Sequence, residues 1–342
     1  MNFDINYYKE TAHKVFNTHS PSGYHIEINK LLLKELKNIG YEGIETNKGN
    51  VVVFLKGKSN EKTLATSAHA DTLGLMVRSI NGDGTLNITK VGGPQLATLD
   101  GEYCKILTRD NKLYSGTILC NSSSSHVYPD ANKERNENNI IVRIDEKISN
   151  KADVEKLGIN NGDYVFIEPK FEILENGFIK SRFIDDKASV VILLTILKYI
   201  KENNITLSYD TYFYFVNYEE VGHGASTVNH KIDEFVTIDM GCIGKDLSGS
   251  EYKVSIAAKD SGGPYDYELT TRLVNIAKQN NIDYVVDIFP YYGSDIGAAY
   301  RAGSDIKGAL IGQGVNASHG MERTHIDGII NTMKLIFLYL NS

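Results

Sequence analysis

Residues 211–218, TYFYFVNY, are the stretch that decides the fold, and two glutamates, Glu219 and Glu220, follow it directly. The run consists almost entirely of aromatic and β-branched residues, which is typical of a strand that is buried on both faces. Such strands occur in α/β proteins, where helices cover both faces of the sheet. The stretch therefore predicts a central strand of an α/β fold with two carboxylates at its carboxyl end.

The same arrangement, an apolar strand followed by a histidine or a carboxylate, recurs along the chain. In open α/β sheets, ligands bind beyond the carboxyl ends of the strands, so these polar residues are expected to meet at one edge of the sheet. They are His69 and Asp71 after strand 64–68, Asp239 after strand 235–238, and His319 in the loop after strand 306–311. Asp185 and Asp186 stand at the start of a strongly amphipathic helix over 187–203.

Further helices are predicted where apolar residues recur at a helical period. They cover residues 6–16, a segment ending near Gly40, residues 265–280 and residues 323–340. From residue 75 to 178 the pattern changes to short strands separated by Gly, Asn and Asp turns, with a polar loop over 121–139. We therefore expect a three-layer α/β/α sandwich with a mixed central sheet, formed by residues 1–74 and 179–342. Residues 75–178 are expected to form an inserted small β-barrel domain.

Composition limits the classes of function. The formal net charge is −7 and no basic stripe occurs, so a nucleic-acid partner is not expected. The first ten residues are largely polar, and no apolar run approaches 18 residues, so we expect neither a signal peptide nor a membrane span. The three cysteines are far apart, which argues against a disulfide framework and a thiolate zinc site. These features together favour a cytoplasmic protein.

The polar residues at the strand ends form a set rich in imidazole and carboxylate and without sulfur. Such a set suits zinc, cobalt or manganese, and two-metal hydrolases share one carboxylate between two ions. Each residue also has an ordinary structural explanation, since a histidine can simply pack and Asp185 can cap a helix. The whole set, in this order, is much better explained by a two-metal site with the ligands His69, Asp185, Glu220, Asp239 and His319.

Five short motifs of the chain resemble the glutamyl/TET-type metallo-aminopeptidases, metallopeptidase family M42 of clan MH, in order and spacing over almost the full length. The motifs are His69-Ala70-Asp71, Asp185-Asp186-Lys187-Ala188, Glu219-Glu220-Val221-Gly222, Ile238-Asp239 and His319-Gly320-Met321-Glu322. An inserted β domain is also part of the resemblance.

The resemblance implies a role for each position. Asp185 would bridge two divalent metal ions, with Glu220 and His319 completing one site. His69 and Asp239 would complete the other. Glu219 would be the general base, and Asp71 would orient the His69 ring. The Asp185–Asp186 peptide bond is expected to be cis.

The residues themselves support the same chemistry, because two cations activate water and polarise a carbonyl while a nearby carboxylate moves the proton. We therefore expect a metal-dependent aminopeptidase that uses a metal-activated water on peptides. The alternatives are a two-metal deacylase or dipeptidase acting on a small metabolite, and an endoglucanase-type glycoside hydrolase. The resemblance also implies a homo-oligomer, since the inserted domain in this family commonly mediates assembly.

Two segments depart from the family's usual pattern. The last motif is extended to SHGMERTH over residues 318–325, and residues 291–295, YYGSD, replace a version with smaller residues. Within the first of these, Arg323 is expected either to bind a substrate carboxylate or to lie on a solvated face. His325 is expected to be a surface or capping group, or else to touch substrate or support Glu322. His223 is expected to line the site or to pack beneath it, and His230 carries no motif.

Overall fold

The computed structural model describes residues 1–228 and 231–342, and these residues divide into two compact units. Unit 1 comprises residues 1–72 and 170–342, and unit 2 comprises residues 73–169. His230, which the sequence leaves without a functional role, lies outside the described residues. Among the described residues, no helix has both the length and the apolar character needed to cross a membrane.

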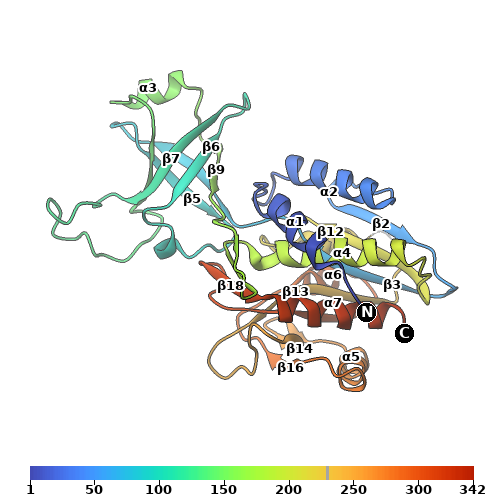
Figure 1. The fold of residues 1–342 in the computed structure, drawn as a ribbon. Coiled ribbons are helices and arrows are strands. Elements are labelled where there is room, and N and C mark those ends of the chain that lie inside the picture. Colours follow the sequence, from blue (N-terminus) through green and yellow to red (C-terminus); the bar gives the residue numbers. More distant parts are fainter. Residues whose placement is uncertain (229–230) are drawn as a thin grey trace. The chain divides into compact units, whose positions relative to one another are not determined.

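A nine-stranded mixed sheet forms the centre of unit 1 (Figure 1). Along the sheet the strands are β1 (Ile44–Glu45), β2 (Val51–Leu55), β12 (Tyr209–Val216), β3 (Ser59–His69), β13 (Glu234–Cys242), β17 (Lys307–Val315), β14 (Val254–Asp260) and β15 (Gly263–Pro264), with β16 (Tyr284–Ile288) also beside β14. Parallel pairs join β3 to β12 and β13, β13 to β17, and β14 to β16, whereas β2–β12 and β14–β17 are antiparallel.

Two hydrophobic cores lie on opposite faces of this sheet, because side chains of a strand alternate between its faces. In β12, Phe213 and Phe215 enter the larger core, whereas Tyr214 and Val216 enter the smaller one. The larger core is shared with α1 (Ile5–Phe16), α2 (Ile26–Ile39), α4 (Ile184–Glu202), α5 (Tyr267–Gln279) and α7 (Ile326–Leu340), and the smaller core with α6 (Asp295–Arg301). The expected three-layer α/β/α arrangement is confirmed.

Helix α4 is the central helix of the larger core. Its residues from Ile184 to Leu197 are all buried. Since the first turn of this helix carries Asp185 and Asp186, burial of its apolar length fixes where these two carboxylates stand.

Unit 2 contains a closed six-stranded antiparallel barrel, as the short strands and turns of the sequence predict. Around the barrel the strands are β4 (Gly74–Ile80), β5 (Leu86–Val91), β8 (Ile140–Ile144), β7 (Leu113–Cys120), β6 (Tyr103–Leu107) and β9 (Tyr164–Ile167). A short helix, α3 (Lys151–Lys156), and a 3₁₀ turn, η1 (Leu96–Thr98), complete it.

The far end of the insertion differs between sequence and structure. The sequence ends the insertion at residue 178, whereas unit 2 ends at Pro169. The reason is a three-stranded sheet within unit 1, in which β11 (Phe178–Ser181) pairs with β10 (Glu172–Ile173) and with β18 (Glu322–His325). Pairing with a strand more than 140 residues later leaves no local signal in the sequence.

Two predicted boundaries are wrong for similar reasons. The helix expected from residue 323 begins at Ile326, because residues 322–325 are drawn into β18 and the His325 side chain caps the helix. Asp239 was expected after its strand but lies within β13, which continues to Cys242 because Asp239 to Cys242 still pair with β17.

Candidate metal centre

Four strands and one helix deliver the expected site residues to one region of unit 1. His69 is the last residue of β3 and pairs in register with Val216, the last residue of the parallel strand β12. Glu219 and Glu220 follow β12 within four residues. Asp239 lies in β13, Asp185 in the first turn of α4, and His319 in the loop after β17. The Asp185–Asp186 peptide bond is cis, as expected.

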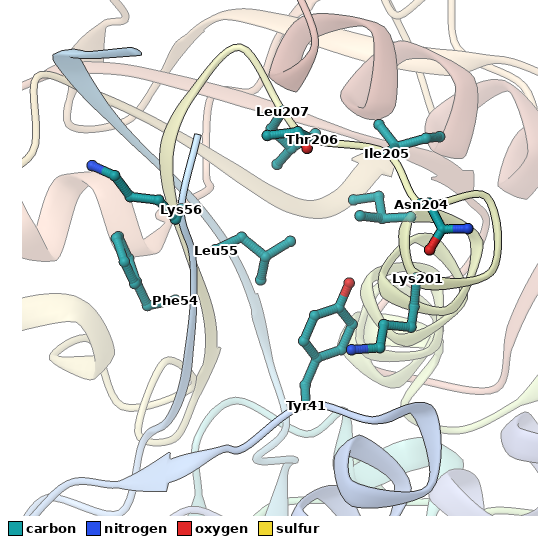
Figure 2. A pocket seen from close by; sticks show the side chains of 10 residues that line it. Tyr41, Phe54, Leu55, Lys56, Lys201, Asn204, Ile205, Thr206 and Leu207 are labelled. Carbon is teal, nitrogen blue, oxygen red and sulfur yellow. The ribbon is translucent and has the colours of Figure 1, made fainter. Parts of the chain in front are cut away.

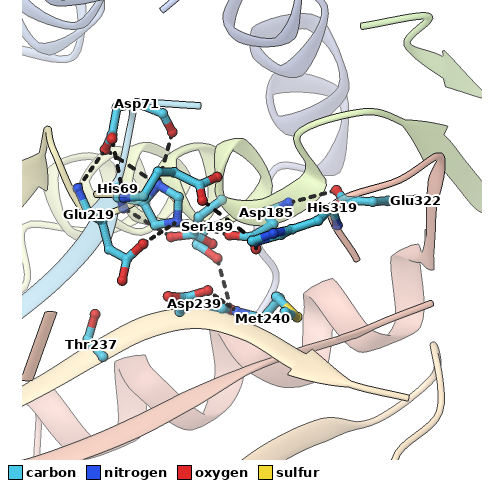
Figure 3. A network of polar contacts seen from close by, with 12 residues as sticks. His69, Asp71, Asp185, Ser189, Glu219, Thr237, Asp239, Met240, His319 and Glu322 are labelled. Atoms are coloured by element: carbon cyan, nitrogen blue, oxygen red, sulfur yellow. Dashed lines mark hydrogen bonds and ion pairs between the residues drawn. The ribbon is translucent and has the colours of Figure 1, made fainter. Parts of the chain in front are cut away.

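Asp185 lies between the two histidines (Figure 3). Its Oδ1 is 2.9 Å from Nε2 of His69, and its Oδ2 is 3.5 Å from Nε2 of His319. The same nitrogen of His319 is 3.6 Å from Oε2 of Glu220. One carboxylate thus presents an oxygen to each imidazole.

The second aspartate of the motif, Asp186, belongs to the cluster as well. His69, Asp185 and Glu220 offer donor atoms that all lie within 4.8 Å of one another, and so do His69, Asp186 and Asp239. Oδ2 of Asp186 also accepts a hydrogen bond from the backbone N–H of His69 at 3.0 Å. The sequence assigns no role to Asp186. Its place directly after Asp185 at a helix start was the only available signal.

Asp71 connects the His69 strand end to the glutamate loop. Nδ1 of His69 lies 2.9 Å from the backbone carbonyl of Asp71 and 3.6 Å from its carboxylate. That carboxylate accepts backbone hydrogen bonds from Glu219 at 3.1 Å and Glu220 at 3.4 Å, and a 2.5 Å bond from the Ser22 hydroxyl. Its contacts therefore hold the Glu219–Glu220 turn in addition to facing the imidazole.

Glu322, which the sequence names only as part of a motif, holds two of the expected ligands by their backbones. Its Oε2 accepts from the N–H of Asp185 at 3.0 Å, and its Oε1 accepts from the N–H of His319 at 2.9 Å. The side chain is 2% exposed. Glu322 therefore ties the start of α4 to the His319 loop.

Burial and mutual repulsion dominate the electrostatics of the cluster. Burial and the neighbouring carboxylates raise the pKa of Glu220 well above its usual range, and the same causes act on Glu219. Burial and Asp185 raise the pKa of Asp239 to about 7. For Asp185, burial is outweighed by hydrogen bonds from His319 and His69, which lower its pKa. Several carboxylates therefore compete for positive charge in a small buried volume.

The donor set fits a divalent cation. Oε1 of Glu220 and Oδ1 of Asp186 are buried and have no hydrogen-bond partner. Buried carboxylate oxygens are normally satisfied, so these two require an explanation. Imidazole and carboxylate are good ligands for divalent metals. A cation held by either group of donors would satisfy the buried oxygen of Glu220 or of Asp186 and relieve the repulsion.

The remaining residues of interest have structural partners. Arg323 donates to Oε1 of Glu251 through both Nε (3.0 Å) and Nη2 (2.7 Å) and lies over the Phe178 ring. His325 caps α7 through Nδ1, which is one of its expected roles, and its Nε2 contacts the Asn176 carbonyl at 2.9 Å. His223 stacks on Tyr218 with ring centroids 5.1 Å apart.

A pocket of about 390 Å³ in unit 1 is separate from this cluster. Figure 2 shows its lining residues, among them Tyr41, Phe54 and Lys201. Lys201 lies near the end of α4 and Asp185 at its start, so roughly 24 Å of helix separates them. The pocket therefore does not contribute to the candidate metal centre.

Comparison with known proteins agrees with the geometry. The family model described as M42 glutamyl aminopeptidase matches residues 49–335. "Putative aminopeptidase YhfE" of Bacillus subtilis is 44% identical over 325 residues, which cover 94% of each chain.

Solved structures share the fold over nearly the whole chain. A TET aminopeptidase from the marine sediment archaeon Thaumarchaeota archaeon SCGC AB-539-E09 superimposes with a TM-score of 0.90 at 19% identity, covering 98% of this chain and 96% of the other. The TET1 peptidase of Pyrococcus horikoshii, described as assembling into a tetrahedron or a large octahedral shell, gives a TM-score of 0.85 at 23% identity, with 97% and 99% coverage. The expectation of a metal-dependent aminopeptidase is confirmed, and the chain belongs to the M42 glutamyl aminopeptidase family.

Proposed function

We propose that the protein removes N-terminal residues from peptides at a centre of two divalent cations in which Asp185 is the shared ligand. Glu220 and His319 complete one cation site, and His69 and Asp239 complete the other. The observation that carries this proposal is the position of Asp185, with one oxygen 2.9 Å from the His69 imidazole and the other 3.5 Å from the His319 imidazole. We assign the catalytic domain to unit 1, since all these residues belong to it.

Bound cations of this kind lower the pKa of water and polarise the scissile carbonyl. Glu219 is the residue that receives the water's proton and returns it to the leaving amine. Its Oε2 lies 3.8 Å from Nε2 of His69, and its side chain is 14% exposed, so it borders the cluster and still reaches solvent. Asp71 keeps Glu219 in this position by accepting its backbone hydrogen bond and orients the His69 ring from the opposite side.

Substrate profiling with blocked and free N-termini tests the proposed reaction. Aminoacyl p-nitroanilides and short peptides should be cleaved when the amino terminus is free and should resist cleavage when it is acetylated. Turnover of acetylated substrates alone would overturn the peptidase assignment and favour a deacylase.

Zinc or cobalt is the proposed metal, with manganese also compatible with these ligands. Protein stripped with a chelator should regain activity with these ions and bind two per chain in a titration followed by elemental analysis. Saturation at one ion per chain would contradict the shared-ligand arrangement.

We further propose that the chain forms a homo-oligomer and acts in the cytoplasm. The relation to assembling TET peptidases supports the first point, and light scattering coupled to size-exclusion chromatography tests it. A monomer at micromolar concentration would contradict it. Fractionation of cells that express the protein tests its location.

A further inference from the structure

Residues 291–295, YYGSD, connect β16 to α6 and are one of the two segments in which the sequence departs from the pattern of the family that it resembles. The segment contacts the metal centre at two separate places. Tyr292 reaches β13, which carries Asp239, and Asp295 reaches the loop that follows Glu219 and Glu220. None of the roles assigned above uses either residue.

Tyr292 faces the strand segment around Asp239. Its hydroxyl donates to the backbone carbonyl of Met240 at 3.1 Å. The hydroxyl also lies beside the carboxylate of Asp239, where it opposes the effect of burial on the pKa of Asp239. The Tyr292 side chain is half-buried, with its ring centroid 5.2 Å from that of Phe289. Tyr292 thus restrains the backbone next to Asp239 and lies beside the Asp239 carboxylate.

Asp295 restrains the loop that follows Glu219 and Glu220. Oδ1 of Asp295 accepts the backbone N–H of Ala225 at 2.9 Å, and the Asp295 side chain is 2% exposed. A Cβ at Gly224 would stand 2.5 Å from the same oxygen, so the loop approaches Asp295 as closely as its backbone allows. The segment between Tyr292 and Asp295 therefore contacts both β13, which carries Asp239, and the loop that follows Glu220.

Hydrogen bonds from neighbouring residues hold the segment itself in place. A segment that restrains other residues must be fixed in this way. The carbonyl of Tyr292 accepts from the N–H of Ser261 at 3.1 Å and from the Ser261 hydroxyl. Ser294 shares a 2.8 Å hydrogen bond with the Tyr265 hydroxyl, which also donates to Asp260 at 2.7 Å. Residues in and next to the β14–β15 turn therefore fix the position of the segment.

We propose that residues 292–295 are a clamp that sets the distance between Asp239 and the Glu219–Ala225 loop, with Tyr292 as the positioning residue for Asp239. This inference rests on the proposed role of Asp239 as a ligand. Partners that orient a metal ligand typically change metal affinity or activity about 10- to 100-fold when removed. Tyr292 acts through Asp239, so its loss should alter cation binding and kcat and leave KM nearly unchanged.

The matched pair Tyr292→Phe and Tyr291→Phe tests the clamp, because both remove one phenolic hydroxyl from neighbouring residues and Tyr291 is 98% exposed. Each purified variant is stripped of metal and titrated with Co²⁺, with visible absorbance as the readout, and kcat and KM are measured separately. We expect Tyr292→Phe to weaken binding of one of the two Co²⁺ ions and to lower kcat, each about 10- to 100-fold. Tyr291→Phe should match the wild type. Equal behaviour of the two variants would overturn the proposal.

Asp295 provides a second test that does not depend on Tyr292. Asp295→Asn retains an oxygen that can accept from Ala225, whereas Asp295→Ala does not, so the first should keep most of the kcat that the second loses. If Asn and Ala lose kcat equally, or if neither loses it, Asp295 is not part of a clamp. Far-UV circular dichroism of each variant establishes that it is folded.

Asp239→Asn separates failure of this inference from failure of the proposed function. If that variant binds two Co²⁺ ions as tightly as the wild type, Asp239 is not a ligand and both proposals fall. If Asp239→Asn no longer binds one of the two ions while Tyr292→Phe binds both as tightly as the wild type, only the clamp proposal is wrong.

Discussion

The two halves of the candidate metal centre differ in how firmly their histidines are held. In the proposed site of His69 and Asp239, called the buried half, the His69 side chain is 1% exposed and both ring nitrogens have contacts at 2.9 Å. In the proposed site of Glu220 and His319, called the open half, the His319 side chain is 35% exposed and its Nε2 contacts are 3.5 and 3.6 Å long. The buried half is therefore preorganised, whereas the open half depends on a loop. We expect cations and substrate to enter through the open half.

The largest effect should come from Asp185→Asn, which removes the charge that the two halves share. Both cations should be lost and turnover should fall below detection, because each imidazole then faces a neutral amide. Elemental analysis of the purified variant checks this, with the exposed Asp305→Asn as control. Retention of one tightly bound ion would mean that the halves do not share this carboxylate.

Glu219→Gln should impair the chemical step of catalysis without impairing metal binding. The variant should keep both ions and lose about 10²- to 10⁴-fold in kcat, the usual contribution of a general base. Metal content and kcat measured on the same preparation decide this. Metal loss as complete as in Asp185→Asn would instead make Glu219 a ligand.

Glu322→Gln should weaken the open half more than the buried half. The substitution replaces one of the two oxygens that accept from Asp185 and His319 with a donor, so one backbone N–H loses its partner. Affinity for one ion should fall about 10- to 100-fold. Calorimetric titration with Zn²⁺ measures the affinity of the two sites separately. If His69→Ala and Glu322→Gln weakened binding of the same ion, Glu322 would not act on the open half.

Chelation should reveal the asymmetry without mutation. Because the His319 side chain is 35% exposed, the ion of the open half should dissociate first in dilute chelator. Metal content followed over time should pause at one ion per chain. A single smooth loss of both ions would show that the halves release together.

The smallest effect concerns the metal-free protein. His69→Ala should lower the free energy of unfolding by about 1 to 2 kcal/mol more than His319→Ala, because it removes two short, buried hydrogen bonds. Urea denaturation in the presence of a chelator measures the difference. Equal losses would mean that exposure of the two rings has no bearing on stability.

The residues that sequence could identify are those whose chemistry is visible locally. An apolar strand followed by His69, Glu219 or Glu220 is a local pattern. The apolar residues of β12 likewise indicate a strand that is buried on both faces of the sheet. The structure brings these residues together with Asp185 and His319, while their assigned roles stay predictions.

The residues that sequence could not assign act through contacts between distant segments. Glu322 accepts from a residue 137 positions earlier, and Tyr292 donates to one 52 positions earlier. Asp186 is conspicuous as a charge beside Asp185, but its hydrogen bond to the His69 backbone depends on how α4 meets β3. Tertiary packing brings these hydrogen-bond partners together, and the local pattern of the sequence does not reveal it.

The three-stranded sheet of β10, β11 and β18 has a consequence for protein engineering. Unit 1 is interrupted three residues after His69, and the returning chain forms β11, where Ser181 pairs with Glu322. The chain therefore leaves unit 1 close to His69 and, after its return, pairs with the strand that carries Glu322. A graft that exchanges residues 73–169 for another module keeps this sheet, whereas one that cuts at residue 178 removes β10 and leaves β11 paired with β18 alone. The junctions, rather than the barrel, set how freely such modules can be exchanged.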